Sequence, residues 1–193
     1  MLSGEFHEFH REWLGKANQY DGHDLHSLFD KFFTLFVVYN RLHAETTFVL
    51  ARRNPKILST RSTFPDSKAA TSYVLQYLRA TDYINGLRDA PACQASIERI
   101  IDLIDREVFA VKLDMIYGKP QRGKDLELRQ KLRSGSAADQ GHAILDVLYS
   151  IRCNLFHGHK DFVPVQAELL RPTIILLGKT IDLLYAKLSV EPD

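Results

Sequence analysis

The run from Asp24 to Arg53 most constrains the fold of this chain. Its apolar residues recur every three or four positions, the spacing that places them on one face of an α-helix. They are Leu25, Leu28, Phe32, Leu35, Tyr39 and Leu42. The pair Asn54-Pro55 ends the pattern, because proline breaks a helix and disfavours the helical conformation of the residue before it. We therefore expect one long amphipathic helix here.

Helical periodicity continues along the rest of the chain, and no segment has a convincing strand pattern. Pro172 falls inside the last expected helix and is predicted to kink it. The further helices are expected at about residues 66–87, 97–108, 136–155 and 165–188. The predicted fold is an all-α, up-and-down helical bundle with additional short helices, in a single domain spanning residues 1–193.

Composition sets the class of protein. A chain of 193 residues with 45% hydrophobic and 25% charged residues is long enough for one domain with a sizeable core. The two cysteines, Cys93 and Cys153, are too few for a disulfide scaffold, which favours a reducing compartment. The first ten residues do not resemble a signal peptide, and the apolar stretch Phe32–Tyr39 is too short to span a bilayer. We expect a cytoplasmic protein with no membrane association.

Chemically, the most suggestive segment lies between Arg152 and Lys160. It reads Arg-Cys-Asn-Leu-Phe-His-Gly-His-Lys and follows an apolar helical run. Arginine offers a planar fork of donors for phosphate oxygens, and histidine exchanges a proton near neutral pH, so the pair Arg152 and His157 suits work on a phosphodiester. With 14 Arg and 8 His in the chain, chance alone gives about 0.6 matches to this spacing. The alternative is therefore that the cations and Gly158 only cap the end of the helix.

The positions of these residues on the helix add a geometric condition. Ile144, Leu148, Ile151 and Leu155 mark a buried stripe, whereas Asn154 and His157 fall on a different, polar one. Arg152 and His157 lie five residues apart, about 140° around an ideal helix. They converge only if the helix loosens near Gly158 or if a second subunit completes the site.

A basic segment precedes the motif. Between Lys112 and Arg133 there are seven cations and three acids, although the whole chain has a net charge of only +1. Such a segment can steer a polyanion towards the motif, and it can equally be a solvated loop. We leave both readings open.

Other chemistries find little support. The chain has no glycine-rich phosphate loop and no metalloprotease or hydrolase signature. The pairs His7/His10 and His23/His26 have no converging third ligand, so we expect neither a metal nor a cofactor. Asn40 lies near the apolar face of the long helix; it is either a buried amide bonded for packing or a residue that contacts the motif.

Two segments together resemble the HEPN superfamily, a group of helical nucleotide-binding domains with an Arg-x4-6-His signature. The stretch from Leu148 to Lys160, followed by a long last helix, is similar to the family motif, and the segment Phe32–Leu42 is similar to an aromatic-Asn helix of some members. One departure is Cys153, since the residue after the family arginine is frequently Asn, Asp or His. Asn154, one place later, would have to serve instead.

The resemblance implies a homodimer in which two motifs form one cleft, and a metal-independent endoribonuclease that cuts RNA by attack of the ribose 2′-hydroxyl. His157 would transfer protons, Arg152 would bind the phosphate, and Asn154 would orient or donate a hydrogen bond. His159, Lys160 and Asn40 would help to bind the substrate. Toxins and defence ribonucleases are the usual settings, so an antitoxin or partner protein is also implied. The alternative is a noncatalytic helical module for nucleotide or RNA binding or for protein dimerisation.

Overall fold

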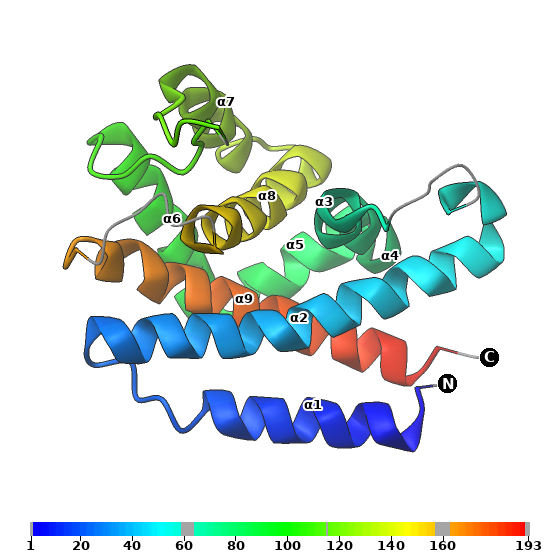
Figure 1. Cartoon of the computed structure of the whole chain (residues 1–193). Helices are drawn as coiled ribbons and strands as arrows, with labels where there is room; N and C mark the ends of the chain where they lie inside the picture. Colours follow the sequence, from blue (N-terminus) through cyan, green and yellow to red (C-terminus); the bar gives the residue numbers. More distant parts are fainter. Residues whose placement is uncertain (1, 59–63, 115, 157–162, 192–193) are drawn as a thin grey trace.

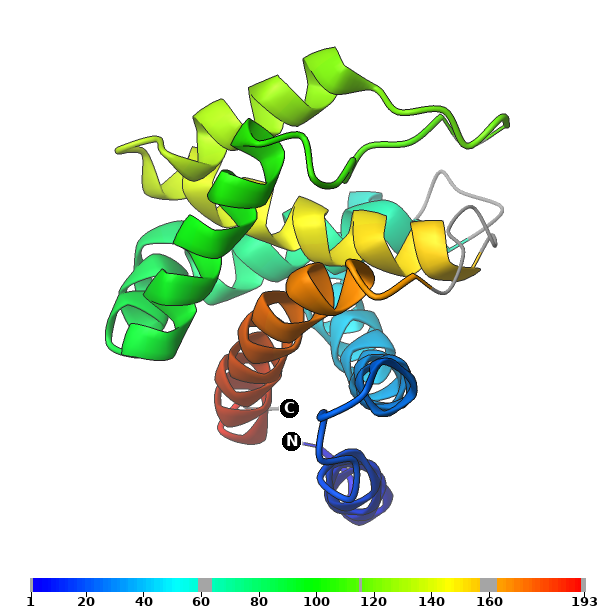
Figure 2. The ribbon, with the colours of Figure 1, turned by 90° about the vertical axis from the view of Figure 1, so that its left-hand side faces the viewer.

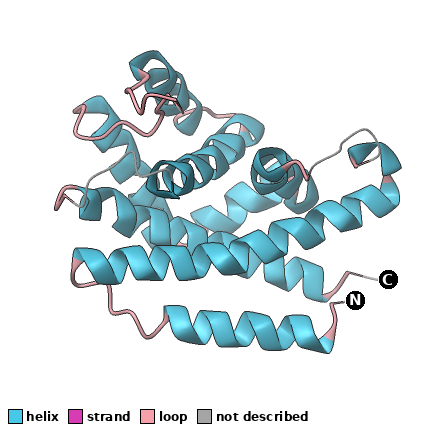
Figure 3. Ribbon diagram, in the orientation of Figure 1, coloured by secondary structure: helices cyan, strands magenta, loops and turns pink. Residues whose placement is uncertain are grey.

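The computed structural model describes residues 2–58, 64–114, 116–156 and 163–191. Within these ranges the chain forms helices joined by turns and loops, and no β-strand is present (Figure 3). The one β-type pairing in the same ranges is an isolated antiparallel bridge between Leu113 and Pro120. The prediction of an all-α helical bundle is confirmed.

Three long helices form one side of the molecule (Figure 1): α1 (Gly4–Ala17), α2 (Leu25–Arg53) and α9 (Gln166–Ser189). Helix α2 packs against both of the others. It begins after Asp24, whose carboxylate accepts the Ser27 amide at 2.9 Å, and a short 3₁₀ helix, η1 (Pro55–Ile57), follows it. Both ends of α2 therefore lie where the sequence predicts them.

The second expected helix is divided in the structure. Its parts are α3 (Asp66–Lys68), the π-helical segment η2 (Ala69–Tyr73), α4 (Val74–Leu78) and α5 (Ala80–Arg88). The break comes at Arg79, where φ is +70°, in the left-handed region that is costly for a residue with a Cβ. Beyond it, α5 buries Tyr83, Ile84 and Leu87. Packing of these side chains decides the direction of α5, because neither glycine nor proline marks the break in the sequence.

Helix α8 (Ala137–Phe156) carries the first part of the Arg-His motif and runs through the middle of the molecule (Figure 2). It packs against α5, α7 (Arg122–Leu132), η2 and α9, and α7 in turn packs against α6 (Pro91–Asp105). The hydrophobic pattern did not predict α7, which buries few apolar side chains. Part of the basic segment is thus helical rather than a loop.

The core of α8 follows its predicted stripe. Ile144 and Leu148 are fully buried and Ile151 nearly so, whereas Leu155, in the last turn, is only half-buried. At the other end the Ser136 hydroxyl accepts the Asp139 amide at 3.3 Å, as expected for an N-cap. The helix that presents Arg152 is therefore firmly docked in the core.

A buried hydrogen bond joins α2 to the helix that starts at Asp66. The Tyr39 hydroxyl donates to the Ala70 carbonyl at 2.5 Å, and Tyr39 is completely buried. Ala70 lies in η2, one turn after Asp66, and a π-helical segment frees carbonyls from the regular pattern. This bond fixes the start of that helix beside the middle of α2.

None of the helices, over the residues that the structure describes, has the length and apolar character needed to cross a bilayer.

Truncation of Ile151 tests how firmly α8 is docked. Ile151→Ala should lower the free energy of unfolding by about 2 to 5 kcal/mol, because it removes buried methyl groups and leaves a cavity. The matched control is Ile175→Ala on α9, where the side chain is 41% exposed, and this change should cost under about 1 kcal/mol. Chemical denaturation measures both. Equal losses in the two variants would contradict the docking of α8.

Candidate functional site

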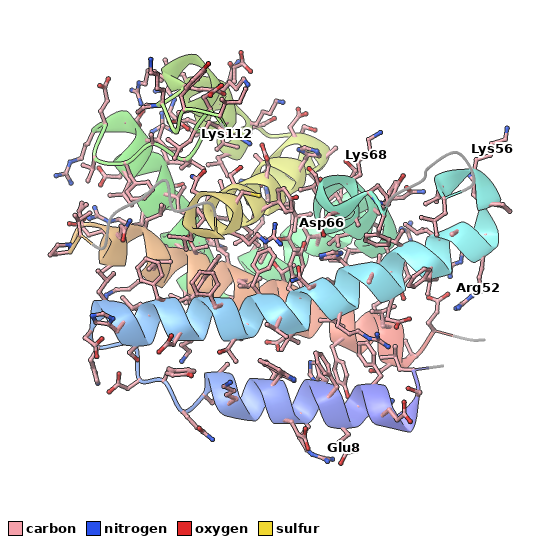
Figure 4. The ribbon with its side chains drawn as sticks, viewed as in Figure 1. Glu8, Arg52, Lys56, Asp66, Lys68 and Lys112 are labelled. Carbon is pink, nitrogen blue, oxygen red and sulfur yellow. The ribbon has the colours of Figure 1, made fainter. Side chains whose placement is uncertain are left out.

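Side chains from three helices meet around the carboxylate of Asp66 (Figure 4). The Tyr149 hydroxyl donates to Asp66 Oδ2 at 3.1 Å, and Arg152 Nη1 lies 3.7 Å from the same oxygen. His43 Nε2 lies 3.8 Å from Asp66 Oδ1. Asn40, through its bond to His43, completes the group. We call Asn40, His43, Asp66, Tyr149 and Arg152 the Asp66 cluster.

Arg152 lies between aromatic rings at the edge of this cluster. Its guanidinium carbon is 5.9 Å from the ring centroids of both Phe36 and Tyr149, a cation–π distance. The side chain remains 23% exposed, so the guanidinium is held in place but can still be reached from solvent. Phe36 belongs to the aromatic-Asn segment of α2. The two segments on which the family resemblance rests therefore meet in space at Arg152.

His43 is the buried base of the cluster. Its Nε2 is 3.1 Å from Asn40 Oδ1, which only accepts, so Nε2 carries the proton and donates. The side chain is only 2% exposed, and the pKa of His43 is lowered to about 4, chiefly by burial; Asp66 opposes this shift and the nearby Arg152 charge adds to it. His43 is therefore neutral at neutral pH. It orients Asn40 rather than contributing a positive charge.

Asn154 lies on the other side of α8. Its side chain is 3% exposed, and Nδ2 donates to the Val111 carbonyl at 2.8 Å. The polar stripe predicted on α8 faces the same way, because Asp146 and Ser150 both bond the Lys112 ammonium. The structure thus places Asn154 where it anchors the segment before α7, away from the guanidinium of Arg152. Its catalytic role stays a prediction.

Three of the predicted site residues, His157, His159 and Lys160, lie outside the described residues. Asn40 lies in the Asp66 cluster, half-buried, and its role in substrate binding also stays a prediction. Cys153, the departure from the family motif, is buried, with Sγ 3.9 Å from Arg152 Nη1.

Sequence reasoning missed His43, Asp66 and Tyr149. Asn40 and His43 lie three residues apart on one helix, a spacing at which side chains interact. This spacing could have indicated that the two residues form a pair. In the sequence, Asp66 stands only at the start of an expected helix, and Tyr149 lies within the stretch that is similar to the family motif. No local pattern links these two residues, which are 83 positions apart in the chain.

The basic segment is less basic in space than in sequence. At least four of its seven cations pair with acids that lie outside the segment, which reduces its excess of positive charge. The pairs are Lys112 with Asp146, Arg122 with Glu107, and Arg129 and Arg133 with Asp105. Steering of a polyanion by this segment alone therefore loses support.

The chain matches no protein-family model, no curated protein and no solved structure. Over the described residues, no group of three or more His, Cys, Asp or Glu side chains is arranged to hold a metal ion.

The pKa of His43 leads to a pH prediction. The unfolded chain takes up a proton on His43 near pH 6.5, whereas the folded protein does so only near pH 4. Stability should therefore fall as the pH drops through this window, by up to about 3 kcal/mol from this group. In His43→Gln this contribution is absent, so the wild type should lose more stability than the variant between pH 7 and pH 4.5. Urea denaturation at both pH values measures the difference.

Phe36→Leu is the control, because it removes buried volume near His43 without removing a titrating group. This variant should be less stable than the wild type by the same amount at both pH values. If His43→Gln also differs from the wild type by a constant amount, His43 is not held neutral by the fold.

Proposed function

We propose that this protein is a metal-independent endoribonuclease of the HEPN type, which cuts RNA by attack of the ribose 2′-hydroxyl on the adjacent phosphorus. The observation that carries the proposal is the meeting of α2 and α8 at Arg152. The Phe36 ring lies 5.9 Å from the guanidinium, and Asp66 connects Arg152 to the Asn40–His43 pair. The segments of α2 and α8 lie far apart in the sequence, and the sequence alone does not require the contact between Phe36 and Arg152.

Arg152 would bind the scissile phosphate. Its guanidinium can donate two parallel hydrogen bonds to phosphate oxygens, and it balances the extra negative charge that the phosphorus centre carries in the transition state. The Phe36 and Tyr149 rings and the Asp66 carboxylate restrict its orientation. A preoriented donor loses less entropy when the phosphate arrives.

His157 would transfer the protons. It follows Phe156, the last residue of α8, directly in the sequence. One imidazole takes the proton of the 2′-hydroxyl as its oxygen bonds to phosphorus, and another gives a proton to the departing 5′-oxygen, which leaves a 2′,3′-cyclic phosphate. In the proposed homodimer the two His157 side chains divide these tasks.

Exposed aromatic rings beside the cluster support an RNA substrate. The Phe64 ring centroid lies 6.3 Å from that of His43 and 6.1 Å from that of Phe48. Phe48 and Phe64 are 45% and 40% exposed, which is unusual for phenylalanine. Unpaired RNA bases stack on such rings.

One observation favours the alternative, a noncatalytic module for nucleotide or RNA binding or for dimerisation. The Asp66 carboxylate lies 3.7 Å from Arg152 and already balances part of its charge. A phosphate at the same guanidinium would meet this carboxylate, which weakens anion binding. The alternative predicts a protein that does not cut RNA at all.

Cleavage of single-stranded RNA in excess chelator distinguishes the two functions. The wild type should leave 2′,3′-cyclic phosphate ends and spare DNA, which lacks the attacking hydroxyl. His157→Ala and Arg152→Ala should each lower the rate by about 10² to 10⁴, because each removes a group that acts in the transition state. The products are identified by mass spectrometry, and light scattering should show a dimer.

The matched control for His157→Ala is His23→Ala, in the exposed turn before α2, which should cut at the wild-type rate. Asn154→Ala should lower stability by about 1 to 3 kcal/mol, because the Val111 carbonyl loses a buried donor. If the wild type leaves all RNAs intact, the binding module replaces the nuclease. Cleavage that persists unchanged in Arg152→Ala and His157→Ala would point to another site or a contaminant.

A further inference from the structure

A pocket with both polar and apolar lining lies directly beside the Asp66 cluster. It has a volume of about 230 Å³ and lies between the second half of α8, the start of α3, residues 111–113 and residues 121–124. Figure 2 shows the segment between α6 and α7 passing over the C-terminal half of α8, and Figure 4 labels Lys112 on it. The side chains that line it include Ser67, Lys112, Gln121, Asp146, Ser150 and Cys153. We call this cavity the Lys112 pocket.

The pocket shares its wall with Arg152. Tyr149 and Cys153 line it, and both touch the Asp66 cluster: the Tyr149 hydroxyl bonds Asp66, and Cys153 Sγ lies 3.9 Å from Arg152 Nη1. In a nucleotide only the ribose separates the base from its phosphate. With a phosphate at Arg152, the base of the same or the next nucleotide would lie near the wall that Tyr149 and Cys153 form.

The lining combines donors and acceptors. The Lys112 ammonium donates to Asp146 Oδ1 at 2.6 Å and to Ser150 Oγ at 2.9 Å, and it remains 21% exposed. The Asp146 carboxylate is 29% exposed beside it, and Gln121 adds an amide. Lys124 is a second, exposed cation of the lining; it favours a polyanion beside the pocket, while the Asp146 carboxylate offsets the charge of Lys112. The edge of a base, which carries both donors and acceptors, matches such a lining.

The size of the pocket agrees with a base rather than a larger ligand. Its volume is below the range of roughly 300 to 1,000 Å³ that is typical for sites of drug-sized molecules. A single base presents a flat, compact shape, and it can enter only when it is not paired within a duplex.

The wall opposite α8 is held in place by hydrogen bonds. The carboxylate of Asp125, which is 1% exposed, accepts a hydrogen bond from the backbone N–H of Lys112 at 2.8 Å. The backbone N–H of Gln121 donates to the backbone carbonyl of Lys112 at 2.9 Å. Asn154 bonds Val111 from the α8 side. These bonds hold the polar groups in fixed positions before a ligand arrives, and a fixed pattern of donors and acceptors is what discriminates between bases.

We propose that the Lys112 pocket binds one unpaired RNA base next to the phosphate at Arg152, and that Lys112, Asp146 and Gln121 read its edge. The proposal rests on the ribonuclease function for its substrate. It assigns to Asn154 the role of holding the wall of a specificity pocket. The protein then cuts single-stranded RNA with a preference for one base beside the cleavage site.

Binding of hexamers that resist cleavage tests the pocket without any catalysis. The probes are 2′-fluoro RNA hexamers of A, C or U and one rich in G, with affinities measured by fluorescence anisotropy. The wild type should prefer one base by about tenfold, in the range expected for one well-placed pair of hydrogen bonds. In Gln121→Ala and Asp146→Asn this preference should shrink to about twofold or less. Arg152→Ala should weaken all hexamers by the same factor.

The matched controls lie away from the pocket. Gln130→Ala changes an exposed glutamine on α7, and Asp102→Asn breaks the exposed pair with Arg99 on α6; both should keep the wild-type preference. Gln121→Ala preserves the hydrogen bond from the backbone N–H of residue 121 to the Lys112 carbonyl, so the variant should keep the wild-type fold. Circular dichroism checks this. Equal affinity of the wild type for all hexamers, or a preference that survives in both pocket variants, would overturn the proposal.

The two proposals can fail separately. If the hexamers are discriminated through the pocket but natural RNA stays intact, the nuclease function fails and the base pocket stands. If RNA is cut at Arg152 and His157 without any base preference, the pocket proposal fails and the nuclease function stands.

Discussion

The hydrogen bond from Tyr39 to the Ala70 carbonyl is the constraint on which the candidate site depends. It is completely buried, and it fastens the start of the α3–α4 segment against the middle of α2. Asp66 lies one turn before Ala70, so this bond sets the distance from Asp66 to His43 and Arg152. Breaking it would leave a buried hydroxyl or carbonyl without a partner, which costs more than the bond itself contributes.

Helix α8 contributes residues to both proposed sites, and its two polar faces differ in chemistry. Tyr149 and Arg152 point towards α2 and α3, where the Asp66 carboxylate and the Phe36 ring lie beside the guanidinium. Asp146 and Asn154 point towards the segment before α7 and bind its backbone and its lysine. The proposed phosphate position and the proposed base pocket therefore both include residues of this one helix.

Much of the fold could be predicted from local patterns. The long helix ends at Arg53 because Asn54 and Pro55 follow, and α8 begins after Ser136 because its hydroxyl caps the helix. These signals act over a few residues and can be read directly. The break at Arg79 could not be predicted, since it arises from the burial of Tyr83, Ile84 and Leu87 by distant helices. Helix α7 could not be predicted from hydrophobic periodicity, because few of its apolar side chains are buried.

The sequence by itself determined the long helices α2, α8 and α9, the caps of α2 and α8, and the choice of Arg152 as a candidate residue, because these depend on residue type and spacing along a few turns. Only the tertiary structure decided which residues surround Arg152. His43, Asp66 and Tyr149 come from three separate helices, and the pairing of Asn154 with Val111 spans 43 positions. Contacts of this kind are fixed by how the helices pack, and packing depends on the combined burial of side chains across the whole chain rather than on any local pattern.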